Sequence, residues 1–249
     1  CEVELGAFPD PPQPPVACSP RPEWAYRLYA ALLERAPEAF GERVHEMAIS
    51  PVSHYLDCQD GRLSWYVTLL GGEAEDSLGP LVEHLSSLYL AKDRLTFEVR
   101  LGDTDRIADA DGLFLRAAAG TDRHRLQFRT PAAFKSRGHY QILPTTRLIL
   151  QNLIQKWNGC FPDCPIEDED GQGMEAMAVG LLCRRFQLRD RTFFLKGNAI
   201  PGFVGEMTLD NRLSGFHREL AGALLTFAGY AGVGIKTSLG MGGVEHHTE

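Results

Sequence analysis

The sequence predicts an α+β fold made of two tandem β-α-β-β-α-β units. The chain has 249 residues, of which 44% are hydrophobic, which is enough for two cores in domains of about 120 residues each. The strands and helices expected from the hydrophobic pattern follow one another in the same order in both halves. This order is the ferredoxin-like one.

The first domain is expected over residues 1–105. Its helices are predicted by apolar residues that recur at intervals of three and four, and its strands by alternation. Asp60-Gly61 indicates a hairpin, and Pro37 suits the first turn of a helix. The expected elements are a strand at 2–5, an irregular proline-rich segment at 9–22, helices at 23–36 and 37–47, strands at 48–57 and 63–70, a helix at 78–90 and a strand at 95–101.

Residues 106–122, which are rich in Asp, Gly and Ala, are expected to link this unit to a second domain over residues 123–249. The second half repeats the pattern, although the halves share no obvious sequence identity. The prediction is therefore two tandem ferredoxin-like (RRM-like) domains. The elements expected in the second are a strand at 124–129, a helix at 145–157, strands at 176–188 and 193–209, a helix at 213–228 and a strand at 241–246.

The charge is distributed unevenly along the chain. The net charge is −8, but residues 1–122 hold 10 Lys and Arg against 21 Asp and Glu, whereas residues 123–249 hold 15 against 12. Six of those twelve acids lie between Asp163 and Glu175, in an expected surface loop. Binding to phosphates depends on a local basic face and not on the total charge. The second domain is therefore the half expected to bind an anionic polymer.

The six cysteines show no disulfide rhythm, which is typical of the reducing cytoplasm. Cys160 and Cys164 have the spacing of half a metal site, but no second ligand pair matches them, so no metal and no cofactor is expected. No apolar run approaches the ~18–20 residues that cross a bilayer. The sequence therefore predicts a cytoplasmic protein without a membrane partner.

Four glycines near the end of the chain, Gly232, Gly234, Gly240 and Gly242, surround Lys236 in the pattern G-x-G-x5-G-x-G. Successive exposed amides in such a loop can form an anion-binding concavity, and we expect a phosphodiester there. A Walker loop is excluded because its lysine directly follows a glycine, and a dinucleotide fingerprint is excluded because too little chain follows. The alternative is a glycine-rich turn that packs tightly. If the loop holds phosphate, Gly234→Asp should abolish binding without unfolding the protein.

This glycine segment resembles the signature of the CRISPR-associated endoribonucleases that cut repeat RNA, members of the RAMP superfamily. Two further segments are similar to that family: 126–135, with Thr130-Pro131 followed by Phe134-Lys135, and 201–206, Pro-Gly-Phe-Val-Gly-Glu. Together with the helix that ends at Lys156-Trp157-Asn158, they keep the family order over residues 124–243. The resemblance also implies two tandem ferredoxin-like domains.

The resemblance implies metal-independent cleavage of CRISPR repeat precursor RNA at a hairpin. The RNA 2′-hydroxyl would attack the neighbouring phosphate, leaving a 2′,3′-cyclic phosphate and a 5′-hydroxyl. It singles out His45, followed by Glu46, and Tyr29 as catalytic residues. Histidine suits proton transfer near neutral pH. The lysine that relatives carry shortly after the histidine is missing, since Ser50 and Ser53 occupy that region.

A set of basic residues is expected to bind the RNA backbone. Alternation along residues 183–189 places Arg185 and Arg189 on one face of a strand and Arg184 on the other. The full set of RNA-binding candidates is Lys135, Arg137, Arg184, Arg185, Arg189, Arg191, Lys196, Gly232, Gly234, Lys236, Gly240 and Gly242.

Three functions stay open at this point. The first is the endoribonuclease, which the resemblance also allows to stay bound to the repeat hairpin and to join other subunits of a CRISPR effector complex. The second is a catalytically inactive relative that only holds the hairpin, which the missing lysine favours. The third is a protein that binds a small anion or nucleotide through the glycine loop, against which the separate basic residues argue.

Overall fold

The computed structural model describes residues 1–9 and 21–249, without the side chains of residues 7–9 and 45. Most of the segment 9–22, expected to be irregular, therefore lies outside the described residues. By its contacts the chain divides into two compact units. The first comprises Cys1–Asp105, Phe194–Asn198 and Ser238–Gly240, and the second comprises Arg106–Phe193, Ala199–Thr237 and Met241–Glu249.

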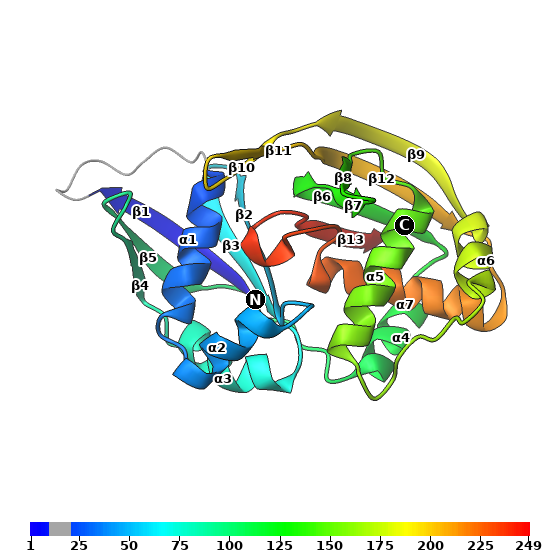
Figure 1. Cartoon of the computed structure of the whole chain (residues 1–249), viewed down its shortest axis with the longest axis horizontal. Coiled ribbons are helices and arrows are strands. Elements are labelled where there is room, and N and C mark those ends of the chain that lie inside the picture. The colour runs from blue at the N-terminus through cyan, green and yellow to red at the C-terminus, as the bar shows by residue number, and fades with distance from the viewer. Residues whose placement is uncertain (10–20) are drawn as a thin grey trace. The chain divides into compact units, whose positions relative to one another are not determined.

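The first unit contains an antiparallel sheet of five strands in the order β2-β3-β1-β5-β4, with its helices on one face (Figure 1). Leaving out the edge strand β4, this is the order of a ferredoxin-like domain, as predicted. Its elements are β1 (Glu2–Pro9), α1 (Pro22–Leu33), α2 (Glu38–Glu46), β2 (Val52–Gln59), β3 (Arg62–Leu69), α3 (Gly72–Glu83), β4 (Ser87–Leu90) and β5 (Leu95–Leu101).

The core of this unit lies between the helices and the sheet. Trp24 and Leu28 of α1 are buried there together with Trp65 of β3 and Phe97 of β5. The Trp24 and Phe97 rings meet edge to face, with centroids 5.4 Å apart. Burying one such side chain contributes about 1.5–3 kcal/mol, so this cluster fixes α1 against the sheet.

The helix predicted over residues 78–90 is wrong at both ends. Helix α3 already begins at Gly72 and continues through Pro80 to Glu83, and residues 87–90 form β4, which pairs with β5. Leu88 and Leu90 are buried whereas Tyr89 is 49% exposed, which is the alternation of a half-buried strand. A short apolar run cannot be assigned to a helix or a strand from its spacing alone.

The second unit contains an antiparallel sheet of four strands in the order β13-β6-β12-β9, again the ferredoxin-like order. Leu126 and Phe128 of β6 are buried on the face covered by α5 and α7 (Figure 1). Its elements are α4 (Ala110–Ala118), β6 (Arg123–Ala132), β7 (Phe134–Ser136), β8 (His139–Gln141), α5 (Thr146–Cys160), α6 (Gln172–Gly180), β9 (Leu181–Asp190), β10 (Phe193–Leu195), β11 (Asn198–Ile200), β12 (Phe203–Asn211), α7 (Gly215–Ala231) and β13 (Val244–Thr248).

Three parts of the second half differ from the prediction. Residues 176–180 belong to helix α6, and the strand expected from 176 begins only at Leu181. The strand expected over 193–209 is interrupted by the hairpin β10–β11, because Lys196 and Gly197 both have positive φ in a two-residue turn. Within the expected linker, α4 forms a helix whose first turn is capped by Asp109.

The cysteines differ from the expectation at one position. Cys58 is disulfide-bonded, whereas Cys1, Cys160, Cys164 and Cys183 are free thiols. The spacing of the cysteines, which shows no disulfide rhythm, did not predict the disulfide at Cys58.

Candidate nucleic-acid interface

Two sequence segments more than a hundred residues apart form one hydrogen-bonded structure in the second unit. The hydroxyl of Thr130, near the end of β6, accepts a hydrogen bond of 2.8 Å from the amide of Gly243. The carbonyl of Pro131 accepts one of 2.9 Å from the amide of Gly242. Gly242 in turn accepts from Val233 at 2.9 Å, across the glycine loop. The Thr-Pro segment is thus the support on which the loop 232–242 is built.

The glycines are needed because the backbones approach closely. Gly234 has φ +92 and Gly242 has φ +65, which is the left-handed region. A Cβ at Gly234 would overlap the carbonyl oxygen of Ala133, and one at Gly242 would overlap that of Val233. Both positions therefore require glycine for packing, whatever the loop binds.

The loop is not the open concavity that the sequence suggested. The amide of Gly232 donates to Ala228 at the end of α7, that of Gly234 donates to the side chain of Asn152 at 2.7 Å, and that of Gly242 is engaged as described. These three amides donate to partners inside the protein, so in this structure they are not free to donate to a phosphate. Gly240 is buried.

Lys236 is the exposed basic side chain of this loop. It has φ +57, which costs a residue other than glycine roughly 1–2 kcal/mol. Its carbonyl accepts a hydrogen bond of 3.3 Å from the amide of Met241. The backbone of Lys236 therefore needs support from neighbouring contacts, while its exposed side chain is available to a ligand.

Lys156, on α5, is a residue that the sequence analysis did not select. It is only 6% exposed, and its ammonium donates to the carbonyls of Ala231 and Gly232 at 2.8 and 2.9 Å and to the hydroxyl of Thr237 at 3.1 Å. Burial lowers the pKa of Lys156 to about 7, although the nearby Cys160 acts in the opposite direction. The available signal was its place on the apolar stripe of α5, seven residues after buried Ile149 and three after buried Leu153.

The hairpin β7–β8 carries two of the predicted basic residues. Lys135 and Arg137 are both exposed, and Arg137 forms the turn together with Gly138, with φ values of 49 and 82. Neither side chain has an ion-pair partner among the described residues. The hairpin begins directly after the Ala133 carbonyl that accepts from Ile235 of the glycine loop at 2.9 Å.

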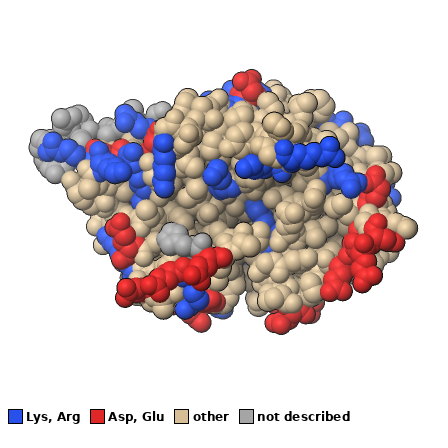
Figure 2. Space-filling model, viewed as in Figure 1, with Lys and Arg blue, Asp and Glu red and all other residues tan. Residues whose placement is uncertain are grey.

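The edge strand β9 presents further basic residues to solvent. Arg185 pairs with Thr208 and Arg189 with Val204 of β12, so the ladder places both arginines on the same face, as predicted. Together with Arg191 they are exposed and have no ion pair within the described ranges. Figure 2 shows basic side chains along the strands of the second unit and acidic ones near α6.

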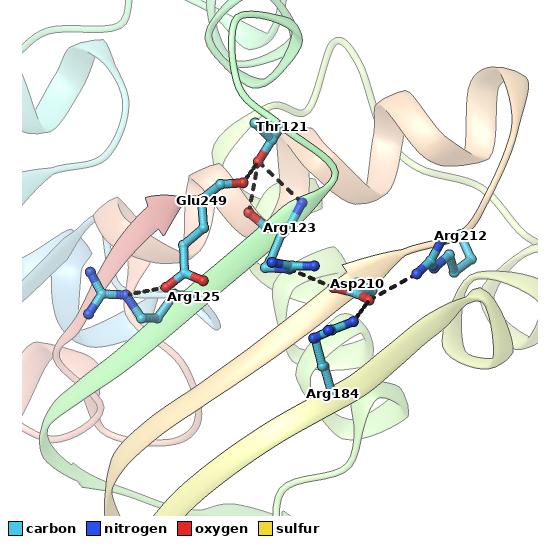
Figure 3. A network of polar contacts seen from close by, with 7 residues as sticks. All are labelled: Thr121, Arg123, Arg125, Arg184, Asp210, Arg212 and Glu249. Atoms are coloured by element: carbon cyan, nitrogen blue, oxygen red, sulfur yellow. Dashed lines mark hydrogen bonds and ion pairs between the residues drawn. The ribbon is translucent and has the colours of Figure 1, made fainter.

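Arg184 lies in a different environment. The register between β9 and β12 shifts beside it, and its guanidinium forms an ion pair of 3.1 Å with Asp210. Arg123 and Arg212 reach the same carboxylate at 3.0 and 3.1 Å (Figure 3). Arg123 first and then Arg184 lower the pKa of Asp210. Arg184 is therefore held by an ion pair at the end of the sheet, unlike Arg185 and Arg189, which have none within the described ranges.

A hollow of about 300 Å³ adjoins this cluster. Its three carboxylates are each bound by arginine: Asp210 as described, Asp122 by Arg218, and Glu249 by Arg125. It is lined by Thr121, Asp122, Arg123, Asp210, Asn211, Arg212 and Glu249. The paired charges leave it without the surplus of one sign that an ion-binding site needs.

The predicted catalytic residues lie in the first unit. The backbone of His45 is in α2, one residue before its end, and its side chain is outside the described part of the chain. Tyr29, on α1, is only 5% exposed. Burial raises the pKa of its phenol, which Ser50 partly offsets, and the hydroxyl makes no well-formed hydrogen bond to a described residue.

His54, on β2, has a structural role. Its Nδ1 accepts from the indole N–H of Trp65 at 3.2 Å, and its Nε2 lies 2.8 Å from the carbonyl of Ser238 in the same unit. These contacts require a neutral ring with the proton on Nε2. Burial lowers the pKa of His54 to about 4. His54 is thus not free to exchange protons with a substrate.

Lys196 belongs to the part of the hairpin β10–β11 that groups with the first unit. Its ammonium lies 6.0 Å from the ring centre of Tyr26 on α1, within range of a cation–π contact. The Tyr26 hydroxyl accepts from Nε of Arg27 at 3.3 Å. Tyr26 is only partly buried and was not selected from the sequence, although it precedes Tyr29 by one helical turn.

The described residues form neither a metal-binding cluster nor a membrane-spanning helix. No three His, Cys, Asp or Glu side chains gather into a possible metal-binding cluster among the described residues. None of the described helices is both long and apolar enough to cross a membrane.

Comparison with known proteins gives consistent matches. Residues 126–244 match the sequence model of the family described as CRISPR-associated endoribonuclease Cas6. The chain is 30% identical over 229 residues to a protein of that description from Mycobacterium tuberculosis, covering 87% of this chain and 69% of the relative. It is 26% identical over 228 residues to one from Streptococcus thermophilus, covering 91% and 92%.

Solved structures of similar fold cover nearly the whole chain. A Thermus thermophilus Cas6 superposes with a TM-score of 0.66 at 25% identity, covering 99% of this chain and 97% of that one. A Cas6 product complex superposes with a TM-score of 0.77 at 22% identity, covering 99% and 98%. The similarity therefore extends over both units.

Proposed function

The chain belongs to the CRISPR-associated endoribonuclease Cas6 family, and from this premise we propose that it cuts CRISPR repeat precursor RNA to give mature guide RNA. In this proposal the attacking group is a hydroxyl of the substrate, and protein side chains transfer the protons without a metal. The 2′-oxygen loses its proton and bonds to the adjacent phosphorus, while the 5′-oxygen leaves and takes up a proton. The products are a 2′,3′-cyclic phosphate and a 5′-hydroxyl.

The observation that carries the proposal is the structure formed by the Thr130-Pro131 segment and the glycine loop. It combines two segments that resemble the family signature, and it lies beside the exposed basic side chains of Lys135, Arg137 and Lys236, which form no ion pair with any residue that the structure describes. Exposed lysine and arginine without carboxylate partners are available to neutralise phosphates. The sheet face with Arg185 and Arg189 supplies further contacts of this kind.

We assign separate roles to the two parts of the chain. The second domain binds the repeat hairpin through its basic side chains, and the first domain supplies the chemistry. His45 transfers a proton to or from the reacting oxygens, because histidine is the residue type that ordinarily exchanges protons near neutral pH. Tyr29 supports His45, and its buried position means that surrounding groups must move for its hydroxyl to reach RNA.

A second candidate function is an inactive member of the family that holds the repeat hairpin within an effector complex. Two observations favour it. Residues 46–53 contain no lysine, and the Tyr29 hydroxyl is enclosed. Such a protein would bind the same RNA through the same basic residues but leave it intact.

One experiment separates these functions. Purified protein is incubated with labelled repeat RNA in EDTA, and the RNA ends are mapped. The proposal predicts a single cut with a 2′,3′-cyclic phosphate on the upstream fragment. Binding without any cut would support the inactive relative. Absence of both binding and cleavage would contradict both functions.

A further inference from the structure

Lys156 and Asn152 are one turn apart on α5, and both reach the glycine loop. Asn152 accepts from the amide of Gly234 at 2.7 Å, and Lys156 donates to Ala231, Gly232 and Thr237. One side chain thus supplies the acceptor and the other the donors. Lys156 thus contacts both ends of the segment 232–237 that carries Lys236, and Asn152 contacts Gly234 between them.

The Lys156 ammonium is well matched to its acceptors. An ammonium has three donors, and all three are used here. Two of the acceptors are carbonyls at the C-terminus of α7, which lack partners within the helix and carry the negative end of its dipole. The third contact, to the Thr237 hydroxyl, joins this helix end to the residue that follows Lys236. A buried charge without such contacts would cost several kcal/mol.

The backbone at Lys236 needs such support. Lysine avoids a φ of +57. The Lys236 side chain makes no hydrogen bond or ion pair with a described residue that could offset this strain. The residues on both sides of Lys236 are held through Gly234 and Thr237 by the two α5 side chains. Their contacts therefore determine where the exposed Lys236 ammonium projects.

We propose that Lys156 is a positioning residue for RNA binding, which holds the loop so that Lys236 meets a phosphate of the repeat. The RNA ligand in this inference rests on the proposed function, whereas the role of Lys156 in ordering the loop does not. Lys156 itself is buried and does not contact RNA. Its removal should act through Lys236, which distinguishes it from a residue that only stabilises the fold.

A double-mutant cycle tests this proposal by measuring the affinity for repeat RNA at about 0.1 M salt. The RNA carries a 2′-deoxynucleotide just upstream of the cut, so that cleavage does not interfere with the measurement of binding. Loss of one phosphate contact should weaken binding roughly tenfold and reduce the salt slope by about one. Lys156→Met and Lys236→Ala should each show this loss. The double variant should bind no more weakly than either single variant, because both changes remove the same contact. Additive losses, or wild-type affinity and slope in folded Lys156→Met, would overturn the proposal.

The controls use changes of similar chemistry. Lys156→Arg keeps the charge and the donors and should recover most of the affinity. Lys92→Met removes an exposed lysine from the β4–β5 turn and should leave affinity near the wild-type value. If Lys156→Met does not fold, Thr237→Val replaces it in the cycle, because it removes only one of the three acceptors.

A measurement without RNA separates this inference from the proposed function. Amide hydrogen exchange in the free protein should be faster in Lys156→Met for Val233 and Gly234, compared with the wild type. Unchanged exchange would refute the positioning role even if RNA binds. Failure of the wild-type protein to bind repeat RNA would refute the proposed function, and with it the RNA role of Lys156, while faster exchange would still show that Lys156 orders the loop.

Discussion

The hydroxyl of Thr130 and the amide of Gly243 are 2.8 Å apart, although 113 residues separate them in the chain. This bond joins the end of β6 to the start of β13, which are neighbours in the sheet. The glycine loop is therefore a part of the sheet's own framework. Its contribution to RNA binding is therefore expected to come from its exposed side chain, Lys236, more than from its backbone amides.

Gly242→Ala should destabilise the protein strongly, because the new Cβ would overlap the Val233 carbonyl in a backbone with φ +65. Gly138→Ala is the matched control, since Gly138 has φ +82 but open space around it. In this control the free energy of unfolding should fall by about 1–2 kcal/mol, because alanine is strained at this φ but meets no neighbouring atom. Urea denaturation of both variants measures the difference, and equal losses would contradict the packing role of Gly242. By the same argument Gly234→Asp should unfold the protein, which corrects the expectation drawn from the sequence.

Acid should destabilise the protein before the carboxylates titrate. Unfolded His54 binds a proton below a pKa of about 6.5, whereas the folded residue does so only below about 4, because burial opposes the charge. Between these values the unfolded state holds the extra proton, so the free energy of unfolding falls as the pH decreases. The resulting decrease in the free energy of unfolding is roughly 3 kcal/mol at most. Burial lowers the pKa values of His124 and His246 as well, so they act in the same direction.

Denaturation at pH 7 and pH 5 measures this dependence. His54→Gln should reduce the difference in unfolding free energy between the two pH values, whereas His139→Gln, at an exposed position, should leave it unchanged. The assignment fails if His54→Gln shows the full wild-type dependence.

Much of the fold could be predicted because strands and helices differ in hydrophobic period. The order of elements follows from these two periods, and the shared face of Arg185 and Arg189 follows from strand alternation. The boundary between α3 and β4 could not be predicted, since Leu88 and Leu90 fit either period over so short a run. The burial of Lys156 could be inferred from its place on the apolar stripe of α5, but its acceptors could not, because they come from α7 and the loop after it, 75 residues or more later.

Arg185→Ala/Arg189→Ala should weaken binding of repeat RNA and reduce its salt slope by about two, since both side chains are exposed and form no ion pair in the described part of the chain. The position of cleavage should not change, because these arginines hold the RNA and do not take part in the reaction. Filter binding across salt concentrations, with mapping of the cut, measures both. Arg184→Ala serves as the comparison: its guanidinium is engaged by Asp210, so it should change the slope less. Normal binding with lost cleavage in the double variant would reverse this assignment.

His45→Ala should lower the single-turnover cleavage rate about 10²–10⁴-fold while RNA affinity is retained, because general acid–base help acts only on the reaction. A structural histidine would instead lower stability and binding together. The control is His84→Ala, a histidine on the surface of the same unit, which should cleave at the wild-type rate. Wild-type cleavage by folded His45→Ala would place the active site elsewhere.

The central claim is that this protein cleaves the repeat RNA by promoting attack of the RNA's own 2′-hydroxyl on the neighbouring phosphate. Its most direct test is the single-turnover cleavage, in EDTA, of a repeat RNA that carries one 2′-deoxynucleotide just upstream of the cut. The account predicts that this RNA binds as tightly as the unmodified repeat but is not cleaved, while the unmodified repeat is cut to a 2′,3′-cyclic phosphate. Cleavage of the deoxy-substituted RNA at the same position would contradict the mechanism.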